Sequence, residues 1–200
     1  MRKKMVVMFL GLIMAANMNV HAAQPVKTLE DLGVTEKGGI LVDKNGKAID
    51  AIYYNEEDVI IEYTEGNPVP DEPGVVKESV AVPENGIVGR ATRPHYTSTL
   101  TPHNDCAYLH AWSRSDIGIK KMEVTVSGRT VSGSYIPETR AVSPEGYMTM
   151  ATSAYLEPKN FGLNYKVGSG VSQHYYSSAE FGSHSDALHW ELYILVLLGS

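Results

Sequence analysis

Hydrophobic and polar residues alternate from Met122 to Ser127, and the alternation resumes from Thr130 to Tyr135. A period of two residues places a hydrophobic row and a polar row on opposite faces of a β-strand. Residues 127–129, with the sequence Ser-Gly-Arg, interrupt this period as the tight turn of a hairpin does. Because an isolated hairpin is barely stable in water, its hydrophobic row predicts further strands that cover it.

Short segments of the same character recur along the chain. We predict strands at 40–42, 48–54, 59–63, 106–112, 147–155, 161–167, 173–181 and 188–198. We predict turns at 43–47, 113–116, 143–146, 157–160 and 168–170. The only helical signal is a single turn at 27–33, with Thr28 as its cap and Gly33 at its end.

Many short strands separated by glycine and proline turns predict an all-β protein. The expected architecture is an antiparallel β-sandwich or an open barrel. The sandwich is immunoglobulin-like in architecture only, because the chain has a single cysteine and so lacks the immunoglobulin disulfide.

Composition divides the chain into four parts. We expect a signal peptide at 1–22, a small N-terminal β segment at 23–63, an acidic proline-rich linker at 64–89 and a β-sandwich domain at 90–200. The N-terminal segment holds the hairpin signal Asn45-Gly46. Prolines and acidic side chains resist pairing and burial, so we expect the linker to be extended and partly disordered.

The first residues have the pattern of an export signal. Three basic residues at 2–4 precede a hydrophobic run at 5–16, and Val20-His21-Ala22 provides small residues at a cleavage site. The run is too short to span a bilayer comfortably. We therefore expect a bacterial protein that is secreted or periplasmic, with no transmembrane segment in the mature chain.

Charge excludes one class of partner. The formal charge of −6 falls by three to −9 when the three basic residues at 2–4 are removed. This negative charge lies in residues 23–89, whereas 90–200 is neutral overall. Such a distribution argues against nucleic acid as a partner.

Cys106 can form no intramolecular disulfide, so the fold must depend on its hydrophobic core. We expect Cys106 to be a small buried residue at the start of a strand. The alternatives are a link between two chains and a catalytic nucleophile, for which His110 on the same strand lies too far along it to act as the base.

One group of residues has the chemistry of a metal site. Histidine and aspartate are good ligands for zinc, and the group consists of His174, His184, Asp186 and His189. On an extended strand, His184 and His189 point to opposite faces. The site therefore requires a turn at 185–188, and otherwise these are polar residues at the edge of the sandwich.

Aromatic residues suggest a binding surface, because flat rings on a sheet stack on sugars or peptides. The candidates are Tyr108, Trp112, Tyr175, Tyr176 and Trp190. The alternative for the two tryptophans is the core. Tyr175 and Tyr176 face opposite sides of a strand, so at least one should reach solvent.

The segment 192–198 is hydrophobic on both rows, which favours a central strand buried on both faces. At a sheet edge it would favour self-association with a second copy.

We hypothesise that the protein is a non-catalytic module that binds a cell-envelope glycan, peptide or protein. Two alternatives stay open. One is a metal-dependent hydrolase that uses the His/Asp group with zinc. The other is a secreted antagonist or toxin, or the companion of one.

Overall fold

The computed structural model describes residues 26–37, 39–65, 74–82, 92–159, 161 and 165–192. Among these residues the chain forms strands and turns without a helix. The strands are β1 (Thr35–Lys37), β2 (Ile40–Val42), β3 (Ala48–Tyr54), β4 (Val59–Tyr63), β5 (Val75–Val80), β6 (His95–His103), β7 (Tyr108–Ile119), β8 (Lys121–Thr130), β9 (Tyr135–Val142), β10 (Met148–Leu156), β11 (Val167–Ser178) and β12 (Gly182–Glu191). The expected signal peptide and residues 193–198 lie outside the described residues.

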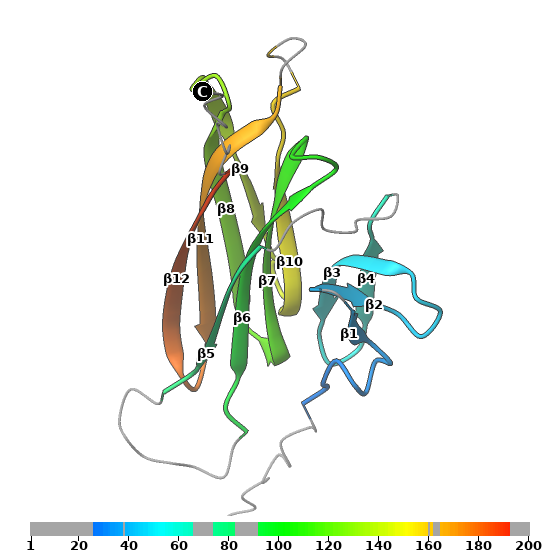
Figure 1. Cartoon of the computed structure of the whole chain (residues 1–200). Coiled ribbons are helices and arrows are strands. Elements are labelled where there is room, and N and C mark those ends of the chain that lie inside the picture. The colour runs from blue at the N-terminus through cyan, green and yellow to red at the C-terminus, as the bar shows by residue number, and fades with distance from the viewer. Residues whose placement is uncertain are drawn as a thin grey trace, which may run out of the picture.

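The strands build two antiparallel sheets, which confirms the predicted all-β fold (Figure 1). The larger sheet has the order β1-β2-β3-β10-β7-β6-β5, with β4 paired to β3, and it curls into a half-barrel. The smaller sheet has the order β12-β11-β8-β9 and packs against the long strands of the larger one. No helix among the described residues is long and apolar enough to cross a membrane.

The predicted alternation in β8 is confirmed, because Met122, Val124 and Val126 are fully buried. The predicted turn at 127–129 is wrong, since these residues continue β8 and the turn follows at 131–134. Glycine is required at position 128 of this strand because the backbone of β11 approaches so closely that no side chain would fit there.

Two other predicted turns are also wrong. Residues 113–116 lie within β7, and residues 168–170 lie within β11. Ser113 and Ser115 are buried, and Ser113 Oγ makes a hydrogen bond to His174 Nδ1 at 2.7 Å. These serines look like turn residues in the sequence, but both lie inside the sandwich, where Ser113 has a partner on β11.

The three strands predicted in the N-terminal segment are confirmed, and β1 is an additional strand that was not predicted. β2, β3 and β4 begin and end at the predicted residues. In the turn between β2 and β3, Gly46 adopts a φ of 82°, and the Asp43 carboxylate accepts hydrogen bonds from two backbone N–H groups. The predicted turn at 27–33 is capped by Thr28, whose Oγ1 accepts from the backbone N–H of Asp31 at 3.1 Å. β3 also pairs with β10, so this segment shares the larger sheet.

The expected linker at 64–89 contains a strand, so that prediction is wrong over residues 75–80. β5 pairs with β6 in register from Val75 opposite Leu100 to Val80 opposite His95. Alternate residues of β5 face the smaller sheet, and Val75 packs against the main core. This strand was not predicted because the segment is rich in charge and proline, and because its inward row (Val75, Lys77 and Ser79) holds only one apolar residue.

Three hydrophobic clusters form the core. The largest lies between the sheets and contains Leu109, Val126 and Trp190 among others. The second joins the N-terminal segment to the larger sheet around Trp112. The third surrounds Tyr96 and Tyr176 at one end of the sandwich. Cys106 is buried in the first cluster, as expected, but it lies in the turn before β7 and not at the start of the strand.

The last described strand, β12, lies at the edge of the smaller sheet and contacts β5 and β6 of the larger one. A central strand was expected for 192–198, which falls mostly outside the described residues. Leu192 follows β12 directly and donates its backbone N–H to Gly168 O at 2.8 Å. The chain therefore reaches residue 192 along a sheet edge.

Candidate functional site

The residues of the predicted metal group divide between the two faces of β12. His184 and Asp186 face the sandwich interior, whereas His189 is exposed on the outer face. They separate because 185–188 is a strand and not the turn that the site required. His174 lies directly opposite Asp186 on β11. Within the described residues no group of three potential ligands could hold a metal ion.

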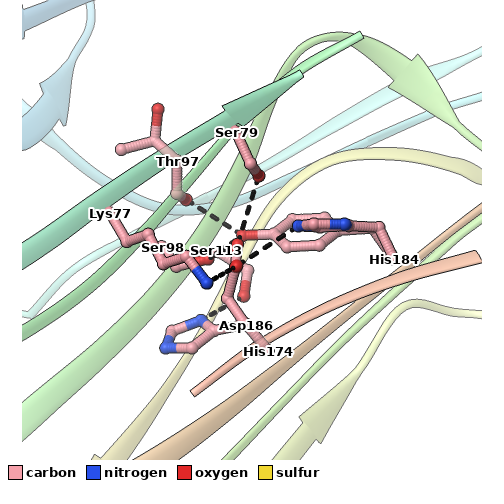
Figure 2. Close-up of polar contacts among 9 residues, drawn as sticks. Lys77, Ser79, Thr97, Ser98, Ser113, His174, His184 and Asp186 are labelled. Atoms are coloured by element: carbon pink, nitrogen blue, oxygen red, sulfur yellow. Dashed lines mark hydrogen bonds and ion pairs between the residues drawn. The ribbon is translucent and has the colours of Figure 1, made fainter. Parts of the chain in front are cut away.

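The structure instead gathers polar side chains around the carboxylate of Asp186, a set that we call the inter-sheet cluster (Figure 2). Its members come from β5, β6, β11 and β12, and they are Lys77, Ser79, Ser98, Tyr176, His184 and Asp186. Sequence reasoning found His184 and Asp186 but missed Lys77 and both serines, which it had assigned to the linker or left unassigned.

Each oxygen of Asp186 has its own partners. Lys77 Nζ lies 2.5 Å from Oδ1, and His184 Nε2 lies 3.2 Å from the same oxygen. Ser98 Oγ donates to Oδ2 at 3.1 Å, and Ser79 Oγ donates to it at 3.2 Å. The carboxylate therefore faces a cation and an imidazole on one side and two hydroxyl donors on the other.

Burial differs strongly within this cluster. The side chain of Asp186 is 0% exposed, whereas that of Lys77 is 50% exposed. Lys77 thus reaches from the surface to a carboxylate inside the protein. Burial raises the pKa of Asp186, but Lys77, His184 and Ser98 outweigh it, and the net pKa is lowered. Asp186 is therefore ionised at neutral pH.

Aromatic rings enclose one side of the cluster. Tyr96 stacks on Tyr176 with 4.3 Å between ring centroids, and the His184 ring lies over Tyr96 at 5.5 Å. The Tyr176 hydroxyl lies 2.6 Å from Ser98 Oγ and donates to Thr97 O at 3.1 Å. These contacts hold the side chain of Ser98 in the position from which it donates to Asp186.

His174 is buried beside the cluster with a partner on each ring nitrogen. Nδ1 lies 2.7 Å from Ser113 Oγ, and Nε2 lies 2.8 Å from Ser172 Oγ. Burial lowers the pKa of His174 to about 4, although the charge of Asp186 opposes this shift. His174 is therefore neutral at physiological pH.

A second polar group lies on the other face of the larger sheet, and we call it the concave-face cluster. It is organised around Asp50, whose Oδ1 accepts from Tyr155 Oη at 2.6 Å and from Ser153 Oγ. His110 stacks on Tyr155 at 4.4 Å and is buried, so its pKa is lowered to about 3 by desolvation and then by His103. Its residues come from β3, from the consecutive strands β6 and β7, and from β10, three parts of the chain that are distant from one another in the sequence.

The predicted aromatic surface is not assembled. Trp112 and Trp190 are buried in different clusters of the core. Tyr176 is buried and Tyr175 is partly exposed, as their opposite orientation predicted. Tyr108 is partly exposed and stacks on His103 in the concave-face cluster.

One end of the sandwich carries an open hollow of about 800 Å³, which we call the end hollow. Its walls come from the β7–β8 turn, the β9–β10 loop and the β11–β12 turn, and its lining residues are Val26, Gly118–Lys121, Ser143–Met148 and Ser178–Glu180. None of the residues of the two polar clusters lines it. The sequence predicts a turn at 143–146, but no pattern in it indicates that three connecting segments meet at one end of the sandwich.

Comparisons of the chain with protein-family models, curated proteins and solved structures found no match.

Proposed function

We propose that this protein is an exported, non-catalytic binding module that holds an apolar segment of a cell-envelope protein in the end hollow. The end hollow carries the proposal, because loops at one end of a rigid sandwich are the usual place for binding residues. The basic and hydrophobic start of the chain supports export.

The lining of the end hollow favours a peptide segment as ligand. Its walls are formed largely by apolar groups, including Ile119, Pro144 and Met148. A single aromatic side chain, Tyr147, belongs to the lining, and a sugar site would be expected to offer more stacking rings. Lys120 and Glu145 supply charges of both signs that can orient a peptide.

The placement of the titratable residues supports a non-catalytic role. Among the described residues, the lining of the end hollow contains neither histidine nor cysteine. The inward-facing histidines described above are packed among aromatic rings or bonded to serines inside the fold. Chemistry of the general acid–base kind needs such groups within reach of a substrate.

The proposal can be tested with two matched variants. Met148 lines the end hollow and Val171 lies on the outer face of the smaller sheet, and both are 39% exposed. Purified protein is screened against arrays of envelope peptides and of glycans, and the affinity of each hit is measured for Met148→Glu and Val171→Glu. We expect a loss of tenfold or more for Met148→Glu alone, since a buried charge weakens an apolar contact. Binding that survives Met148→Glu, or binding to glycans only, would overturn the proposal.

A further inference from the structure

Lys77 and Asp186 bring together the edges of two sheets. Lys77 lies on β5, the last strand of the larger sheet, and Asp186 lies on β12, the first strand of the smaller one. The two strands contact each other at the corner of the sandwich. A bond between these side chains would therefore close the sandwich along that corner.

We propose that Lys77 and Asp186 are a modification site at which the chain forms an amide bond between the Lys77 Nζ and the Asp186 side chain. Three observations carry this proposal. The amine nitrogen lies 2.5 Å from Oδ1, the acid is fully buried, and every other contact that surrounds the carboxylate suits the reaction.

The reaction needs a neutral amine and an activated carboxyl group. Within the pair, the ammonium gives one proton to Oδ1, either directly or through His184 Nε2 at 3.2 Å from that oxygen. The nitrogen lone pair then attacks Cγ, and a C–N bond forms. Ser98 and Ser79 donate to Oδ2, which is where negative charge develops in the tetrahedral intermediate.

The intermediate collapses to the amide when the bond from Cγ to Oδ1 breaks. The nitrogen loses a second proton, and Oδ1 leaves as water with both protons that the ammonium has lost. Oδ2 becomes the amide carbonyl oxygen. One positive and one negative charge disappear, no atom changes its oxidation state, and no other reactant is consumed. Because Lys77 is half exposed, the water has a path to solvent.

The burial of the carboxylate favours the product. Removing an ion pair from water is costly, and a neutral amide avoids that cost. Proximity raises the rate of amide formation, because both groups are already held in contact. The amide would also act as a covalent link in a chain whose single cysteine provides no intramolecular disulfide.

The experiment is a mass measurement on the exported full chain after its N-terminus has been determined. We expect a mass lower than the calculated one by one water, and proteolysis should yield a branched peptide that joins Lys77 to Asp186. The matched control is Lys77→Arg, which keeps the positive charge but lacks the amine, and it should show the full calculated mass.

Two results would overturn the proposal. One is a wild-type chain of full mass, which would show that the residues form only an ion pair. The other is a water deficit that proteolysis assigns elsewhere in the chain. The wild-type measurement decides the question even if Lys77→Arg fails to fold.

Discussion

The two polar clusters both combine an aspartate with serine, tyrosine and histidine, but the partners and the burial of the two carboxylates differ. Asp186 in the inter-sheet cluster is fully buried and is bound by a lysine, a histidine and two serines. Asp50 in the concave-face cluster keeps 28% of its side chain exposed and is bound by neutral hydroxyl groups. His110 Nε2 lies 3.8 Å from Asp50 Oδ1, but burial lowers the pKa of His110 to about 3, so it brings no charge. The fully buried carboxylate thus has a cation, whereas the partly exposed one has only hydroxyl donors.

The sharpest way to break this comparison is to remove the cation. Whether Lys77 is held as an ion pair or by the proposed amide, Lys77→Ala leaves a buried carboxylate with only an imidazole and hydroxyl groups, and we expect it to lower the free energy of unfolding by about 3 kcal/mol or more. Urea denaturation measures the change. Glu78→Ala is the control, because Glu78 is the exposed neighbour of Lys77 and should change stability by less than about 0.5 kcal/mol. Equal effects would show that Asp186 does not depend on Lys77.

Acid should destabilise the fold through two buried histidines, His174 beside the inter-sheet cluster and His110 in the concave-face cluster. The pKa values of His174 and His110 are lowered from 6.5 to about 4 and about 3. Each histidine contributes stability that is fully present above pH 6.5 and is lost as the pH falls toward the lowered value. We expect each to account for a loss of about 2 kcal/mol in the free energy of unfolding between pH 7 and pH 5.

The measurement is urea denaturation at a series of pH values. His174→Gln and His110→Gln should each flatten the dependence on pH, and the His110 variant should continue to differ from the wild type to lower pH. The exposed His189→Gln is the control and should leave the dependence unchanged. A wild-type stability that does not vary between pH 7 and pH 5 would contradict the expected neutral state of the buried histidines.

The smallest effect is expected in the concave-face cluster. Tyr155→Phe removes one hydroxyl donor from Asp50, which solvent can replace, and we expect a loss of about 1 kcal/mol in the free energy of unfolding. Thermal or urea unfolding measures it against Tyr147→Phe, a hydroxyl that lies near an exposed carboxylate. A loss as large as that of Lys77→Ala would show that exposure does not distinguish the two carboxylates.

The sequence predicted local structure well wherever one rule dominated. The hairpin from Ile40 to Tyr54 was correct to the residue, because Asn45-Gly46 and two hydrophobic runs agree. Prediction failed where polar residues lie inside the fold, as at Ser113 and Ser115, and the partner of Ser113 comes from a strand distant in the sequence. Lys77 was missed for the same reason. A charged residue in an acidic segment has the pattern of a solvated one, and only the pairing of β5 with β6 places it near Asp186.

The position of β12 has a consequence for the order in which the chain can fold. This strand supplies Leu188 and Trp190 to the main core and Asp186 to the inter-sheet cluster. Contacts between β12 and β5 join residues from opposite halves of the chain. The core therefore cannot be completed until β12 pairs with β11 and contacts β5, so folding depends on contacts between segments that are distant in the sequence.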